Sequence, residues 1–300
     1  MTDPTSSASP SAGHLLSIGL GYCATALSKR LAPRGFSISG TTRSGSGREA
    51  IERQGWQGLV WTGGSPTVEM GTALGEATHL LLSAAPDEAG DPVLPHVADI
   101  LGRSRNLAWI GYLSTVGVYG DRAGGWVDET TPIAPAGVRS RRRAEAETQW
   151  LELGQKLGCR AQIFRLPGIY GPGRSAIDQM RAGTARRIVK PGQVFNRIHV
   201  DDIARALEAA IVSSTASPIY NLADDEPAPA DEVVAYAAEL LGMTPPPAID
   251  FATATLSPMA AGFYAETKRV SNRLMKAELI TSLTYPTYRE GLHAIASEDR

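Results

Sequence analysis

The chain has 300 residues, and 43% of them are hydrophobic, so it is long enough to bury a large α/β core. A formal charge of −2 provides no basic field and argues against nucleic acid as a partner. The two cysteines form no metal-binding spacing, which favours a reducing, cytoplasmic setting without a metal site. No apolar run approaches the ~18 residues of a membrane span, so no membrane partner is expected.

The pattern along the chain predicts a tail followed by alternating strands and helices. Residues 1–13 are rich in Ser, Pro and Ala and lack a signal-peptide pattern, so they are predicted to be disordered. Strands are predicted at 14–20, 35–42, 58–63, 78–86, 107–115 and 161–171, and helices at 24–35, 48–55, 93–104 and 140–158. Continuous apolar strands alternating with helices indicate a doubly wound parallel sheet, the Rossmann arrangement.

Beyond Gly171 the regular alternation of strands and helices ends, and a smaller α+β lobe is predicted. Helices are expected at 174–183, 200–214, 231–242 and 265–280, a strand at 217–223, and irregular chain at 245–258, before a closing segment at 285–296. We assign residues 14–172 and a return segment, 199–223, to a dinucleotide-binding domain. Residues 173–198 and 224–300 form a C-terminal substrate lobe over the strand ends.

The first strand runs into Gly19-Leu20-Gly21-Tyr22-Cys23-Ala24, which fits the pattern G-x-G-x-x-G/A. The first glycine permits a sharp turn, and the second lets backbone approach a pyrophosphate. The helix that follows offers free N–H groups and a positive dipole end. A tight turn without a ligand is the alternative, but the surrounding strand–helix–strand pattern favours a dinucleotide.

The end of the second strand discriminates between NAD and NADP. An NAD site usually places a carboxylate here, but the sequence continues Thr42-Arg43-Ser44 without an acid. Arg43 can pair with a 2′-phosphate while Thr42 and Ser44 donate hydrogen bonds. The sequence therefore predicts NADP(H) in preference to NAD(H), unless Arg43 only begins a solvated loop.

Several separate stretches together resemble the extended short-chain dehydrogenase/reductase superfamily, of the NAD-dependent epimerase/dehydratase type. They are GLGYCATAL, SAAP, LSTVGVYGD, WVDETTPIAP, FRLPGIYGPGR, RIHVDDIARAL, YNLADDEP and KRVSNRLMKAEL with YPTYREGL. The resemblance implies a Rossmann domain with a small substrate lobe, and a homodimer formed through helices of the large domain. It also implies cofactor contacts from Ala84, Ala85 and Pro167, besides those of the glycine loop.

In that superfamily a Ser or Thr ends strand five, and a Tyr-x-x-x-Lys pair completes the site. The resemblance equates the hydroxyl residue with Thr115, beside Ser114, where it can polarise a carbonyl oxygen. A threonine that only closes the strand is the alternative. The tyrosine position falls on Gly137 and the lysine position on Arg141, so this chain resembles an atypical branch that lacks the pair.

Other residues could take over part of the missing chemistry. Arg141 could hold the nicotinamide ribose, although it is always protonated and cannot carry a proton. Tyr119 and Tyr170 are the candidate proton donors, against a role in packing. His199 is expected to begin a helix, with Asp201 and Asp202 near its start. Either Arg165 or Arg197 could bind an anionic substrate, whereas the basic run at 139–143 reads as a solvated helix face.

The sequence leads to an oxidoreductase hypothesis and a rival. An NADP(H)-dependent enzyme would transfer hydride to or from a small carbonyl or alcohol, sugar-derived compounds included, with an unusual proton donor. One variant is an epimerase or dehydratase that returns the hydride within one turnover. The rival is a catalytically silent NADP(H) sensor, which the missing Tyr-x-x-x-Lys pair motivates.

Overall fold

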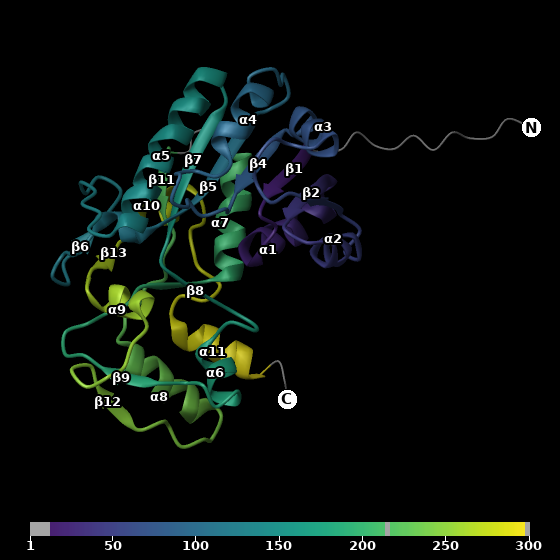
Figure 1. The fold of residues 1–300 in the computed structure, drawn as a ribbon. Coiled ribbons are helices and arrows are strands. Elements are labelled where there is room, and N and C mark those ends of the chain that lie inside the picture. The colour runs from purple at the N-terminus through teal and green to yellow at the C-terminus, as the bar shows by residue number, and fades with distance from the viewer. Residues whose placement is uncertain (1–12, 214–216, 298–300) are drawn as a thin grey trace, which may run out of the picture.

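The computed structural model describes residues 13–213 and 217–297 and is centred on a seven-stranded parallel sheet (Figure 1). The strands lie in the order β11-β7-β5-β4-β1-β2-β3. They are β1 (Gly13–Ile18), β2 (Phe36–Thr42), β3 (Gln57–Val60), β4 (His79–Leu82), β5 (Trp109–Thr115), β7 (Arg160–Leu166) and β11 (Ile219–Asn221). The predicted doubly wound parallel sheet is confirmed.

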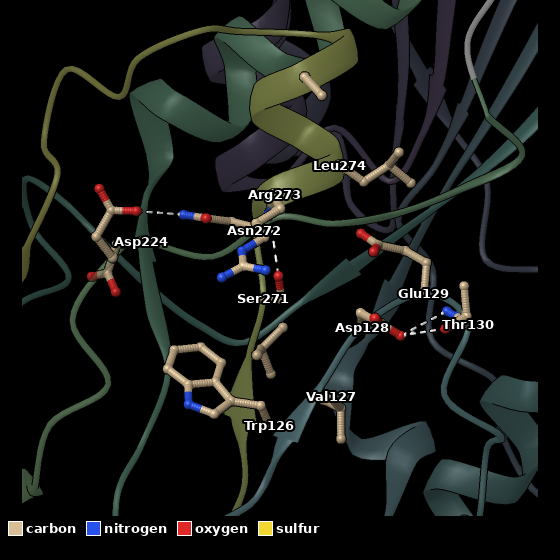
Figure 2. Close-up of a pocket in the computed structure, with 13 residues that line it drawn as sticks. Trp126, Val127, Asp128, Glu129, Thr130, Asp224, Ser271, Asn272, Arg273 and Leu274 are labelled. Atoms are coloured by element: carbon tan, nitrogen blue, oxygen red, sulfur yellow. Dashed lines mark hydrogen bonds between the residues drawn. The ribbon is translucent and has the colours of Figure 1, made fainter.

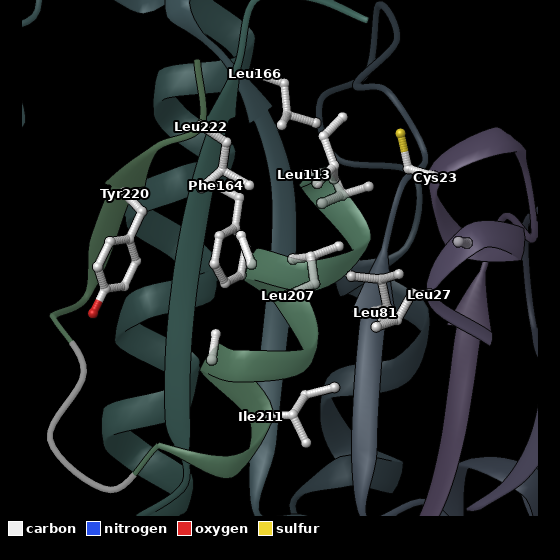
Figure 3. Close-up of a cluster of buried hydrophobic side chains, with 14 of the residues drawn as sticks. Cys23, Leu27, Leu81, Leu113, Phe164, Leu166, Leu207, Ile211, Tyr220 and Leu222 are labelled. Carbon is white, nitrogen blue, oxygen red and sulfur yellow. The ribbon is translucent and has the colours of Figure 1, made fainter. Parts of the chain in front are cut away.

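Helices cover both faces of this sheet. They are α1 (Tyr22–Leu31), α2 (Gly45–Glu52), α3 (Val68–Glu76), α4 (Leu94–Leu101), α5 (Val138–Leu157) and α7 (Val200–Val212), with 3₁₀ turns η1 (Ala32–Arg34) and η2 (Val116–Tyr119). On one face, Leu27 of α1 and Leu207 of α7 pack into the cluster drawn in Figure 3. On the other face, α3, α4 and α5 contribute Met70, Val97 and Trp150. Burial of these apolar side chains stabilises the sheet between its two helical layers.

The strand order places the candidate loops together. Between β1 and β4 the order reverses, and such a switch point is where open α/β sheets bind ligands, at the carboxyl ends of the strands. The glycine loop follows β1, and Ser83 follows β4.

A smaller lobe packs beyond the strand ends, below the sheet in Figure 1. Its helices are α6 (Ala176–Arg181), α8 (Ala230–Leu240), α9 (Pro258–Tyr264) and α11 (Tyr288–Ser297), while α10 (Arg273–Glu278) contacts β11. The short parallel pairs are β8 (Gly168–Tyr170) with β10 (Arg197–His199), β9 (Arg187–Val189) with β12 (Ala248–Asp250), and β6 (Trp126–Val127) with β13 (Arg269–Val270). Ile177, Val234 and Leu292 lie in the core of the lobe. Among the described residues, no helix is both long and apolar enough to cross a bilayer.

The prediction of one strand over 161–171 was wrong, because Pro167 divides it. Proline has no N–H to donate to the ladder, and the chain leaves the main sheet at this residue. Beyond it, β8 pairs with β10 in a separate two-stranded sheet.

The C-terminal region and one helix also differ from expectation. The helix predicted over 265–280 is a strand, β13, followed by the short α10, and the irregular stretch 245–258 contains β12. Helix α3 was missed altogether, although Thr67 caps it by accepting a hydrogen bond from the Met70 N–H. The predicted tail lies outside the described residues except for Gly13, which begins β1.

Candidate functional site

The glycine loop is held in place by the neighbouring strands. The Gly19 N–H donates to Thr41 Oγ1 (2.8 Å), and the Leu20 N–H donates to the Thr41 carbonyl (2.9 Å). Gly19 has a φ of +87°, and a Cβ there would lie 2.8 Å from Ser83 Oγ. This position therefore requires glycine for its conformation and for its close contact with the β4 end.

Gly21 forms an open cradle at the start of α1. A Cβ built on Gly21 would meet no atom within 4 Å, so free space adjoins the backbone here. No side chain caps the helix, and its first turn carries no acid. The Thr25 N–H is the first to bond back, to the Gly21 carbonyl (2.8 Å), so the amides of Tyr22 and Cys23 lack helical acceptors. This arrangement fits a pyrophosphate, which needs backbone donors and close approach.

The end of β2 lies beside this loop. The Arg43 side chain is exposed and has no ion-pair or hydrogen-bond partner within residues 13–213 and 217–297. Ser44 caps α2, with its hydroxyl accepting from the Gly47 N–H (3.1 Å), and Thr42 is half-buried. A free guanidinium at this strand end can pair with an added anion.

Two further predicted contacts lie nearby. Ala84 and Ala85 follow Ser83, whose N–H donates to the Ile18 carbonyl of β1 (3.0 Å). Tyr22, on the first turn of α1, donates its hydroxyl to the Pro172 carbonyl (2.9 Å). This bond joins the glycine loop to chain 150 residues later, and it was not foreseen.

Thr115 ends β5 with a hydroxyl that keeps its proton available. Its Oγ1 accepts from the Gly117 N–H (3.1 Å), and it donates to no acceptor in the described part of the chain. The side chain is half-buried. Thr115 therefore caps η2 and can also donate to a substrate oxygen.

Ser114, next to it, points into the protein instead. Its hydroxyl donates to Glu147 Oε1 (2.5 Å), and Glu147 also pairs with Arg165, whose Nη2 lies 2.7 Å from Oε2. All three side chains are buried. Ser114 is consequently inaccessible to a substrate, and Arg165 is committed to an internal ion pair rather than to an anionic substrate.

Tyr119 belongs to the same interior network. It is fully buried, its hydroxyl donates to Asn221 Oδ1 (2.8 Å), and it accepts from Arg165 Nη1 (2.9 Å). Burial raises the pKa of Tyr119. This placement removes Tyr119 from the candidate proton donors.

Tyr170 is also committed to packing. It is 7% exposed, its hydroxyl donates to the Thr287 carbonyl (3.2 Å), and its ring lies edge-on to His199. His199 caps α7 by accepting from the Asp201 N–H, as expected, and burial lowers its pKa. Asp202 accepts from the Thr284 and Tyr285 N–H groups. Tyr170 therefore packs between the core of the lobe and the start of α7, and its hydroxyl is occupied.

The positions of the missing pair lie at the start of α5. Gly137 is the N-cap and supplies no side chain, and a Cβ there would meet no atom within 4 Å. Arg141 is exposed and donates to the Ala136 carbonyl (2.6 Å). The other proposed anion-binding arginine, Arg197, donates to the Phe195 and Ala228 carbonyls.

A cavity of about 770 Å³ lies toward the β11 end of the strand order. It is bounded by the segment after β5, the segment after β11, and α10, and Figure 2 shows Trp126, Glu129 and Arg273 on its walls. None of the predicted site residues lines this cavity. In the described ranges, no group of three or more His, Cys, Asp or Glu side chains could hold a metal ion.

Sequence reasoning missed the Glu147–Arg165 pair, although a signal existed. Glu147 lies three residues from both Ala144 and Trp150, so it shares their buried helix face. An acid on such a face requires a buried cation, and Arg165 is the only basic residue in the apolar run 161–167.

A glycine loop at the switch point of a doubly wound sheet is the arrangement typical of dinucleotide-binding proteins. The model of the NAD dependent epimerase/dehydratase family matches residues 96–223, a range that begins after the glycine loop. Over this range the chain is similar to the family, which agrees with the resemblance in the sequence.

Three relatives extend the comparison. A functionally unknown conserved protein from Silicibacter pomeroyi DSS is 48% identical with a TM-score of 0.86, covering 96% of this chain and 99% of that one. Protein YeeZ of Escherichia coli (strain K12) is 27% identical over 237 residues, 76% of this chain and 84% of its own. The 3-diazoavenalumate denitrifying reductase of a Streptomyces species is 30% identical over 183 residues, 55% of this chain and 58% of its own.

Proposed function

We propose that the protein is an NADP(H)-dependent oxidoreductase that acts on a small carbonyl or alcohol, sugar-derived compounds included. The observation that carries this proposal is the open cradle at Gly21, at the same edge of the sheet as the uncommitted hydroxyl of Thr115. A likeness to a reductase over 183 residues supports an oxidoreductase rather than another class of dinucleotide-binding protein.

Each part of the site has a proposed task. The amides of Tyr22 and Cys23 bind the pyrophosphate, Arg43 pairs with the 2′-phosphate, and Arg141 holds ribose hydroxyls. When bound, the dinucleotide supplies the hydride donor or acceptor. Thr115 donates a hydrogen bond to the substrate oxygen and polarises it. The proton comes from water, because the Tyr119 and Tyr170 hydroxyls are buried and already donate hydrogen bonds to protein atoms.

The central test is turnover of the purified protein with NADPH across a panel of aldehydes and ketones, followed by reduced-nicotinamide absorbance. Wild type is expected to consume NADPH with at least one compound, and Thr115→Ala to lower kcat/KM by about 10-fold or more. Thr115→Ser keeps the hydroxyl and should retain most of the activity. Equal activity of wild type and Thr115→Ala would contradict the role of Thr115.

The preference for NADP gives a separate prediction. Arg43→Ala should weaken NADPH binding by about 1–3 kcal/mol, the usual loss for a charge-assisted contact, and leave NADH binding nearly unchanged. Fluorescence titration measures both affinities. Arg53→Ala, an exposed arginine just beyond α2, is the matched control. A similar loss for both nucleotides would refute the assignment of Arg43.

One observation favours the sensor as a second candidate function. Gly137 and Arg141 replace the pair that the resemblance would require, and the two tyrosines proposed in its place are internal. Under this alternative NADPH binds, but no compound of the panel is turned over. Absence of NADPH and NADH binding would exclude both functions.

A further inference from the structure

The segment that follows β8 packs against the first turn of α1. The Tyr22 hydroxyl donates to the Pro172 carbonyl (2.9 Å), and a Cβ built on Gly171 would overlap that hydroxyl. Backbone hydrogen bonds in both directions between Gly171 and Arg174 (3.3 and 3.0 Å) close a tight turn. This turn is therefore fixed beside the helix end that carries the proposed pyrophosphate site.

Arg174 ends the turn and places its guanidinium beside Tyr22. The Arg174 Cζ atom lies 5.9 Å from the centre of the Tyr22 ring. Arg174 is exposed, and its guanidinium makes no hydrogen bond or ion pair within residues 13–213 and 217–297. An exposed guanidinium without an acidic partner can pair with an anion that a ligand brings.

The positive charge of Arg174 acts on the first turn of α1. Burial raises the pKa of Tyr22 to about 12 and that of Cys23 to about 11, and in both cases the Arg174 charge opposes the shift. Two acids, Asp178 and Asp201, also act on Tyr22, and neither forms an ion pair with Arg174 in the described part of the chain. Tyr22 and Cys23 are the residues whose amides lack helical acceptors, so the free cation and the free donors lie at the same helix end.

We propose that Arg174 binds the pyrophosphate of the dinucleotide from the side of the C-terminal lobe, and that the Tyr22 hydroxyl positions the turn that carries it. This inference rests on the proposed function and deepens it. The glycine loop offers neutral N–H donors, whereas Arg174 adds a formal positive charge for the negative charges of a pyrophosphate. Because Arg174 lies in the segment that leads into the lobe, the bound dinucleotide would contact both parts of the protein.

The test is a fluorescence titration of full-length Arg174→Ala with NADPH and with NADH, which share the pyrophosphate. We expect the affinity for each nucleotide to fall by about 10-fold, the scale of one charge-assisted contact. The affinity for 2′-AMP, which has no pyrophosphate, should stay unchanged when it is measured by competition with NADPH. Arg174→Lys keeps the charge and should retain most of the affinity. Arg103→Ala, at an exposed position after α4, is the matched control.

The positioning role of Tyr22 has a separate readout. Tyr22→Phe keeps the ring and removes the hydrogen bond to Pro172, so it should weaken NADPH binding by about 3-fold or more. In the Arg174→Ala background, the same substitution should have no further effect, because the residue that it positions is gone. An equal loss in both backgrounds would mean that the hydroxyl acts independently of Arg174.

The outcomes separate this inference from the proposed function. If the wild type binds both nucleotides and turns over a compound of the panel, but Arg174→Ala matches Arg103→Ala, the inference alone is overturned. A loss confined to NADPH would also overturn it, because that result would place Arg174 at the 2′-phosphate. If the wild type binds neither nucleotide, the proposed function fails and the inference fails with it.

Discussion

Replacing Gly21 with valine is expected to abolish NADPH binding while leaving the fold intact. The Gly21 backbone has φ −93° and ψ −161°, an extended conformation that valine adopts readily. Because a Cβ there meets no protein atom within 4 Å, the new side chain disturbs no packing. The valine side chain would instead occupy the space beside the backbone that the pyrophosphate needs. An overlap costing about 3 kcal/mol would weaken binding by at least about 100-fold.

The measurement is a fluorescence titration with NADPH beside a thermal unfolding curve. Gly71→Val is the matched control, because a Cβ at Gly71 in α3 also enters open space, away from the loop. Both variants should unfold near the wild-type temperature, and only Gly21→Val should lose affinity. Wild-type affinity in Gly21→Val would place the dinucleotide elsewhere.

Glu147→Ala is expected to destabilise the protein by about 3–5 kcal/mol, the cost of removing one partner of a buried ion pair. Arg165 would keep its charge at a site where its side chain is 4% exposed. The Ser114 hydroxyl would lose its acceptor at the same time. The loss should therefore exceed that of an ordinary surface substitution several-fold.

Urea unfolding measures this loss. Glu145→Ala, two residues earlier on the exposed side of α5, should change the free energy of unfolding by less than about 0.5 kcal/mol. The double variant Glu147→Leu/Arg165→Met should recover part of the loss, because it leaves no unpaired buried charge. A change below about 1 kcal/mol in Glu147→Ala would mean that water or another acceptor reaches Arg165.

Local sequence signals predicted much of the sheet. The apolar run at 78–86 predicted β4, and Gly158, with a φ of +67°, ends α5 where a glycine stop was expected. The glycine loop was equally predictable, since its turn, its helix start and its neighbouring strand lie within about 30 residues.

Long-range contacts account for most of what the sequence did not predict. Strands β6 and β13 have two residues each, and only their pairing across more than 140 residues makes them strands. The hydroxyls of the two candidate tyrosines also depend on long-range contacts. Tyr119 is held by Asn221, and Tyr170 by Thr287, 102 and 117 residues away, so no local pattern could reveal that their hydroxyls are occupied.

At the end of β5, substitutions at two adjacent residues are expected to have different effects, one on folding and the other on turnover. Successive side chains of a strand point to opposite faces of the sheet, so Ser114 is buried on one face while the half-buried Thr115 projects on the other. In a saturation mutagenesis library, losses at Ser114 should appear as low protein abundance, and losses at Thr115 as normal abundance with poor turnover. Under the proposed function, a substitution at Thr115 would change turnover and leave in place the buried Ser114–Glu147 hydrogen bond that holds this strand end.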